Sequence, residues 1–302
     1  MSHHHHHHAP ATHGRLIAAF AVTFSIFLSE LIGAFITGSL ALLADAGHML
    51  VDSSGLIIAL FASHLMRKPR SDTHTWGYAR AEVLAAALQS GMLLLITIMV
   101  SIEAIKRLFA PAEVVGSLML IFGVIGLVGN LISLGVLASS RRANLNMRAA
   151  FLEVANDALG SIAVIAAAGL AWLSGWDQWD AIASLAIAAL MGPRAIILLR
   201  DSLKILMEQV PDGLDLHDIR THITAVDHVI DVHDLHVSTI ATGTVVLTAH
   251  VTVDEKCFRS GHSQMILHDI QDCVAEHFPI SIEHSTIQLD SPKHRDHERL
   301  VH

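Results

Sequence analysis

The chain has 302 residues, of which 52% are hydrophobic and only 16% are charged, and its mean hydropathy is +0.52. A water-soluble domain of this length needs fewer apolar residues for its core, so the composition indicates a membrane protein. The 7 Pro and 19 Gly exclude a collagen-like or low-complexity chain. The two cysteines, Cys257 and Cys273, lack the CxxC spacing of a cysteine zinc finger.

Charge divides the chain into two parts. Residues 1–210 carry 13 basic and 13 acidic side chains, whereas residues 211–302 carry 6 basic and 15 acidic ones, together with 13 of the 23 histidines. An apolar part without net charge therefore precedes an acidic, histidine-rich part. The acidic part favours cations over nucleic acid as partners. The run His3–His8 is typical of a purification tag, so residues 1–13 are assigned to a tag or N-terminal tail.

Six apolar stretches in the first part are each long enough for the ~20 helical residues that cross a bilayer. They cover approximately residues 15–37, 40–65, 80–107, 115–138, 147–173 and 179–199. The sequence thus predicts an integral membrane protein with a six-span transmembrane domain over residues 14–209. Because basic residues accumulate on the cytoplasmic side, both termini are expected in the cytoplasm. The basic residues that flank the second, fourth, fifth and sixth spans are Arg67, Lys68, Arg70, Arg141, Arg142, Arg148, Arg200 and Lys204.

The pattern changes after Pro211. Residues 214–226 and 262–277 are amphipathic with helical spacing, and residues 229–240, 244–253 and 280–289 are typical of strands. This order predicts a cytoplasmic α+β domain of the ferredoxin-like kind over residues 210–290, followed by a tail at 291–302. The predicted fold class is therefore an all-α six-helix transmembrane bundle joined to a small ferredoxin-like domain.

Two of the predicted spans contain pairs of ionisable residues, and such residues at membrane depth mark ion pathways. His48 and Asp52 are four residues apart, as are Glu153 and Asp157, so each pair shares one helix face. The segments repeat the pattern His/Glu-xxx-Asp-xx-Gly and run in opposite directions across the membrane, which is a known transporter arrangement. One imidazole and three carboxylates can enclose Zn²⁺ or a similar divalent ion.

Carboxylates gathered in a low dielectric repel one another, so at least one should hold a proton when no metal is bound. Metal entry then expels protons, as an antiporter requires. Alternatively, these residues form a purely structural cluster of polar contacts between the helices. That alternative is disfavoured because no Lys or Arg lies in the central part of either span to neutralise the carboxylates. Asp45 lies nearer the outer mouth, and two roles for it stay open: a peripheral or capping role, or a part in ion entry. Competing function classes are an intramembrane metalloenzyme, which needs a vacant metal position, and a membrane-anchored metal sensor; no HExxH motif is present.

The sequence resembles the cation diffusion facilitator family of divalent-metal transporters over about residues 14–290. The runs that carry the resemblance are SLALLADAGHMLVDSSGL (39–56), HTWGYARAEVLAA (74–86), NMRAAFLEVANDALGS (146–161) and VHDLHV…TVVLTAHVTVD (232–254). The resemblance implies a homodimer in a bacterial inner membrane that exports Zn²⁺ in exchange for protons by alternating access, and not an enzyme. His48, Asp52 and Asp157 match the family's transport site. Glu153 stands where zinc-specific members carry His, so we expect Cd²⁺, Co²⁺, Fe²⁺ or Mn²⁺ as further substrates.

The resemblance also implies metal sites outside the membrane. In the cytoplasmic domain, strand alternation puts His233 on one face with Leu235 and Val237. In the loop after the second span, Asp72 and His74 match a metal site in which Tyr78 replaces a further His. Arg80 and Glu208 match an ion pair of the family, with ordinary surface charge as the alternative. The expected cytoplasmic ligands are His233, His250, His284 and Asp290, with His236, His262 and His268 as lesser candidates.

Overall fold

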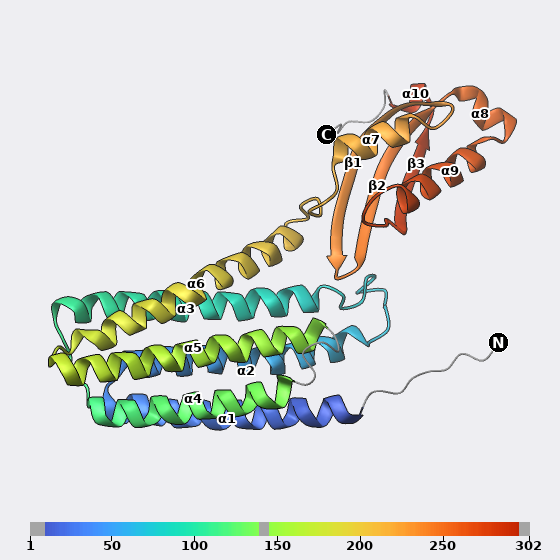
Figure 1. Cartoon of the computed structure of the whole chain (residues 1–302). Coiled ribbons are helices and arrows are strands. Elements are labelled where there is room, and N and C mark those ends of the chain that lie inside the picture. The colour runs from blue at the N-terminus through green and yellow to red at the C-terminus, as the bar shows by residue number, and fades with distance from the viewer. Residues whose placement is uncertain (1–9, 139–144, 296–302) are drawn as a thin grey trace. The chain divides into compact units, whose positions relative to one another are not determined.

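The computed structural model describes residues 10–138 and 145–295, and Figure 1 shows their helices and strands. The chain forms two compact units: the first joins the residues up to Leu60 to Leu88–Leu199, and the second joins Phe61–Ala87 to the residues from Arg200 onward. The histidine run 3–8 and the basic residues 141 and 142 lie outside the described residues.

Long helices occupy the six predicted spans. Successive helices alternate in direction, so α2 and α5 are antiparallel (Figure 1). Within the described residues, α2 to α6 are long and apolar enough to cross a membrane, and residues Ala21–Thr37 of α1 form a shorter apolar helix. The helices are α1 (Pro10–Thr37), α2 (Leu40–Met66), α3 (Ala81–Phe109), α4 (Gly116–Ala138), α5 (Leu145–Ser174) and α6 (Gln178–Leu206).

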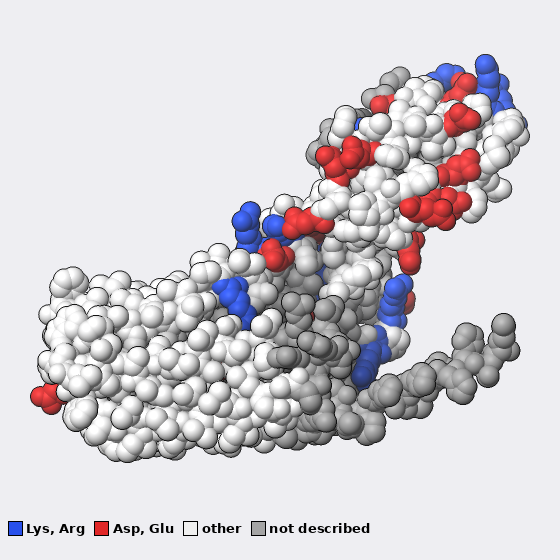
Figure 2. Space-filling view, viewed as in Figure 1, with Lys and Arg blue, Asp and Glu red and all other residues white. Residues whose placement is uncertain are grey.

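Small side chains pack the interior of the helical unit. One buried cluster takes residues from all six helices, and many of them are alanines, such as Ala41, Ala104 and Ala167. Small residues let helices approach closely where lipid supplies no hydrophobic driving force between them. Large apolar side chains point outward instead, with Phe35 78% and Trp172 84% exposed. Figure 2 shows that most of this surface carries no charged residue, as a lipid-facing surface requires.

A buried carboxylate fastens the turn between α1 and α2. Asp180 of α6 accepts hydrogen bonds from Ser39 Oγ at 2.6 Å and from the backbone N–H of Leu40 at 2.8 Å. These groups lie at the start of α2, where backbone N–H groups lack intrahelical partners. Arg107 adds a hydrogen bond to the carbonyl of Gly38 at 2.7 Å. Asp180 therefore caps a helix to which it does not belong.

The second unit contains a three-stranded sheet covered by helices, so the predicted α+β layer is confirmed. The strand order is β1-β2-β3, with β1 and β2 antiparallel and β2 and β3 parallel. Its core joins residues of α7, α9 and the sheet, among them Ile219, Leu247 and Ile270. The elements are α7 (Leu216–Thr224), β1 (Val229–Ala241), β2 (Thr244–Val253), α8 (Glu255–Ser260), α9 (Ser263–Glu276), β3 (His284–Asp290) and α10 (Pro292–Arg295).

A bulge in β1 changes which side chains share a face. Asp234 has a φ of 49°, and the register with β2 shifts between His233 and His236. Val232, Leu235 and Val237 all belong to the core, which regular alternation from 232 to 237 would not allow. His233 therefore lies on the face opposite this core, together with His236. Regular alternation had predicted His233 beside Leu235 and Val237, and the extra residue corrects that prediction.

Candidate metal centres

Among the described residues, two groups bring together three side chains that could hold a metal ion. One consists of His48, Asp52 and Asp157 in the helical unit. The other consists of His233, His250 and Asp290 in the second unit. In each group, the candidate ligand atoms all lie within 4.8 Å of one another.

The group in the helical unit joins α2 to α5. His48 Nε2 lies 3.2 Å from Asp52 Oδ2 and 3.3 Å from Asp157 Oδ1. The four-residue spacing on α2 explains the first contact, and the antiparallel neighbour α5 supplies the second. The His48 and Asp157 side chains are each only 5% exposed. One nitrogen and two carboxylates here supply three of the four ligands of a tetrahedral Zn²⁺ site, so a fourth ligand is needed to close it.

Glu153 lies outside this three-residue group. Its Oε1 accepts a hydrogen bond from Arg194 Nη2 of α6 at 3.3 Å, with the two side chains 33% and 42% exposed. Asp52 is nevertheless among the electrostatic neighbours of Glu153. The second and fifth spans carry no Lys or Arg in their central parts, but Arg194 of the sixth span supplies the compensating cation. In this conformation, Arg194 pairs with the carboxylate that was expected to bind metal.

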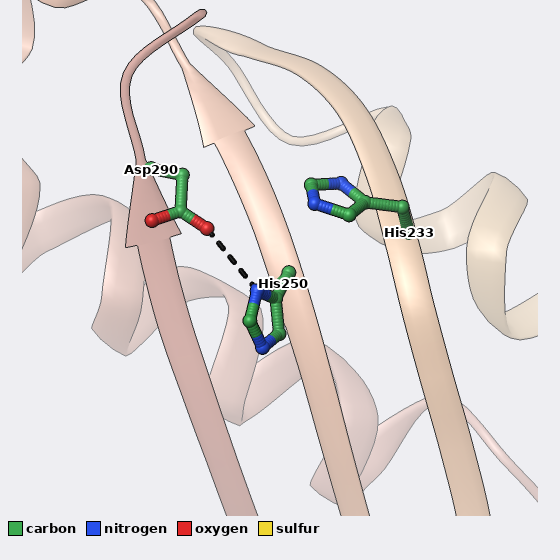
Figure 3. Close-up of side chains that lie close together, drawn as sticks. All are labelled: His233, His250 and Asp290. Atoms are coloured by element: carbon green, nitrogen blue, oxygen red, sulfur yellow. Dashed lines mark ion pairs between the residues drawn. The ribbon is translucent and has the colours of Figure 1, made fainter. Parts of the chain in front are cut away.

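The second group lies across the sheet, with one side chain from each strand (Figure 3). His233 and His250 are register partners on β1 and β2, and their ring centroids are 5.5 Å apart. His250 Nδ1 lies 3.3 Å from Asp290 Oδ2, and Asp290 is only 3% exposed. Two imidazoles and a carboxylate form a ligand set suited to Zn²⁺.

His284 is not brought to this group. It begins β3, six residues before Asp290, so about 20 Å of strand separates the two at about 3.3 Å per residue. Its ring instead packs edge-on against Trp76, with centroids 4.8 Å apart. The distance along the strand alone therefore keeps His284 and Asp290 from binding the same metal ion.

The lesser cytoplasmic candidates contact other polar groups. His236 Nε2 lies 3.0 Å from Asp234 Oδ1, His262 Nδ1 lies 2.7 Å from Ser260 Oγ, and His268 Nε2 lies 3.4 Å from Asp272 Oδ2.

The loop residues Asp72 and His74 belong to neither of the three-residue groups found among the described residues. The His74 ring stacks on Tyr78 with centroids 4.6 Å apart. In the same unit, Arg80 Nη2 and Glu208 Oε1 form an ion pair at 2.6 Å. With side chains 38% and 59% exposed, this pair is expected to contribute about 1 kcal/mol or less to stability.

Comparison with known proteins identifies the class. Residues 16–207 match the family model of the cation efflux transmembrane domain, and residues 211–292 match that of the cation efflux protein cytoplasmic domain. The chain therefore belongs to the cation diffusion facilitator family, whose members are metal-cation transporters rather than enzymes. It is an integral membrane protein of metal efflux.

Three relatives illustrate the similarity. The chain is 38% identical over 288 residues to the cadmium, cobalt and zinc/H(+)-K(+) antiporter of Bacillus subtilis, covering 95% of this chain and 91% of that protein. It is 38% identical over 278 residues to the zinc transporter ZitB of Escherichia coli, covering 91% and 87%. It is 37% identical over 272 residues to the metal cation efflux system protein CzcD of Cupriavidus metallidurans, covering 90% and 84%.

Proposed function

We propose that this chain exports Zn²⁺ from the cytoplasm in exchange for protons, and that His48, Asp52 and Asp157 hold the ion during transport. The observation that carries the proposal is the convergence of these ligand atoms to within 4.8 Å inside an apolar helical unit. The relatives support it, since one is named a zinc transporter and another an antiporter of zinc with H⁺ and K⁺.

The ligand chemistry couples metal to protons. Zn²⁺ binds neutral imidazole and ionised carboxylate, so protons compete with it for the same atoms. With Asp52 and Asp157 ionised, the two negative charges balance a divalent ion, which lowers the cost of holding it among apolar helices. Protons entering from the outer side then displace the metal. Alternating access follows when the antiparallel helices α2 and α5 open the site to one side at a time.

Glu153 is the proposed determinant of metal choice. Released from Arg194, its carboxylate would supply a fourth ligand beside Asp52. An oxygen ligand in place of an imidazole makes the site harder, which admits Cd²⁺, Co²⁺, Fe²⁺ or Mn²⁺ beside Zn²⁺. Zn²⁺ stays the preferred ion because His48 keeps a nitrogen in the ligand set.

The second unit is proposed to bind Zn²⁺ at His233, His250 and Asp290 and to join two copies of the chain. A metal bound there would connect all three strands and make the unit's stability depend on cytoplasmic metal. The match to a cytoplasmic domain of cation efflux proteins supports cytoplasmic termini, and the bacterial relatives support an inner-membrane location. His284, Asp72 and His74 have no part in this proposal.

Transport into inside-out vesicles tests the proposal. Asp157→Asn keeps the shape of the side chain and removes its charge, and it should abolish Zn²⁺ uptake driven by a proton gradient. Asp177→Asn, at an exposed position of the α5–α6 turn, is the matched control and should transport like the parent chain. Normal uptake by Asp157→Asn would contradict the assignment. Failure of the reconstituted parent chain to move any metal would favour a membrane-anchored sensor instead.

A further inference from the structure

A second buried polar cluster lies in the helical unit. Glu30 of α1 and Asp45 of α2 are both 0% exposed, and their carboxyl groups are neighbours. Among the described residues, none of their four oxygens makes a hydrogen bond of regular geometry, although the Asp45 carboxyl lies close to Glu30 and to Ser161. Two ionised carboxylates side by side in a low dielectric are strongly unfavourable, so this pair must bind at least one proton or a cation.

Two glycines make room for these carboxylates. A Cβ atom at Gly126 of α4 would collide with Glu30 Oε1 and lie 3.0 Å from Ser161 Oγ. A Cβ atom at Gly160 of α5 would lie 2.6 Å from Asp45 Oδ1. Helices α4 and α5 therefore lack a side chain where each carboxylate approaches them, so any larger residue would displace the oxygens.

Asn130 of α4 is linked to this pair through Ser161, which also lies close to Asp45. Its amide nitrogen donates to Ser161 Oγ at 3.3 Å, the hydroxyl that lies beside Glu30 at Gly126. Its Oδ1 is buried without a hydrogen-bond partner, and the residue is 0% exposed. A buried acceptor without a partner costs about 1 to 3 kcal/mol. A cation held by the two carboxylates and also bound by Asn130 Oδ1 would satisfy it.

We propose that Glu30, Asp45 and Asn130 form a second station for the divalent metal ion inside the helical unit. This inference rests on the proposed transport function and deepens it. The two carboxylates balance the charge of a divalent cation, and the ligand atoms are all oxygens. Such a set holds Zn²⁺ more weakly than one that includes an imidazole and is better suited to Mn²⁺.

The position of the station gives it a role in release. Asp45 precedes His48 by three residues, or about 4.5 Å along α2, toward the turn that joins α1 to α2. An ion leaving His48 in that direction would meet the oxygen-only ligands next. Passage through a membrane protein requires sites that bind strongly enough to admit an ion and weakly enough to release it. The second station is the weaker of the two metal-binding sites on this path.

Metal counting on the purified full-length chain tests the proposal. We use a His250→Ala background without the zinc-binding run His3–His8, which removes the cytoplasmic group and the histidine run, and measure Zn²⁺ and Mn²⁺ by equilibrium dialysis and elemental analysis. The background should bind a tight and a weaker zinc ion. Glu30→Gln should remove only the weaker ion, and His48→Ala should remove only the tight one. Glu103→Gln, a partly exposed position of α3, is the control and should retain both.

A steric variant keeps the test decisive if Glu30→Gln misfolds. Gly126→Ala replaces none of the ligand residues but sets a methyl group against Glu30 Oε1, and it should weaken binding of the second zinc ion about tenfold. A single bound ion in the background, or an unchanged weaker ion in both Glu30→Gln and Gly126→Ala, would overturn the proposal. A Glu30→Gln variant that changes only proton release and leaves zinc binding unchanged would also overturn the proposal. By contrast, a tight ion that survives His48→Ala would refute the transport site and not the second station.

Discussion

The ion pair between Arg194 and Glu153 leads to a quantitative prediction about metal affinity. At 3.3 Å, two unit charges attract by about 5 kcal/mol at an effective dielectric constant of 20. Because the side chains are 42% and 33% exposed, solvent screening reduces the net contribution to about 1 kcal/mol. A metal ion that recruits Glu153 must break this pair. Arg194→Gln removes that cost, so Zn²⁺ affinity should rise about fivefold.

The assay is competition between the purified chain and a zinc chelator, in a background that lacks the cytoplasmic group. Arg200→Gln neutralises another arginine of α6 and should leave the affinity unchanged. In the double variant Arg194→Gln/Glu153→Gln, the gain should disappear because no carboxylate remains to be released. Unchanged or weaker binding by Arg194→Gln would refute the reasoning, as would a gain that persists in the double variant.

Three further predictions concern metal choice, helix capping and a buried thiol. Glu153→His should sharpen the preference for Zn²⁺ over Mn²⁺ and Cd²⁺ in liposome flux assays, and an unchanged flux ratio would refute this. Asp180→Ala should destabilise the chain by about 2 kcal/mol, because the start of α2 loses its cap; thermal unfolding that matches the parent chain would exclude that role. Burial raises the pKa of the Cys273 thiol, so its thiolate forms only at higher pH, and alkylation in a Cys257→Ser background should need more alkaline conditions than in urea. Identical pH curves for the folded and unfolded chains would contradict this.

The architecture could largely be predicted from the sequence because its signals are local. Apolar runs of span length gave the positions of α1 to α6, and the change to alternating residues after Pro211 gave the sheet. The departures come from long-range packing. Residues 280–283 were expected to begin the last strand, but β3 starts at His284, and Ile280 and Ile282 belong to the packing around the core instead.

In the candidate metal sites, too, the sequence predicts the local features and not the long-range contacts. The helical spacing of His48 and Asp52 follows from the sequence alone. The contact between Glu153 and Arg194 crosses two helices and leaves no local pattern. The bulge at Asp234 likewise has no signal in the strand's alternation. Pairwise contacts between distant spans, rather than the residues within one span, therefore had to come from the structure.

The zinc K-edge absorption spectrum of the membrane-bound ion shows whether His48 is one of its ligands. It is recorded on a His233→Ala/His250→Ala chain without the run His3–His8, loaded to occupy only its tightest site. We expect a nitrogen and oxygen shell at about 2.0 Å with one imidazole, and this imidazole signal should disappear when His48 is replaced by Ala. A spectrum with several imidazoles, or one that His48→Ala leaves unchanged, would contradict it.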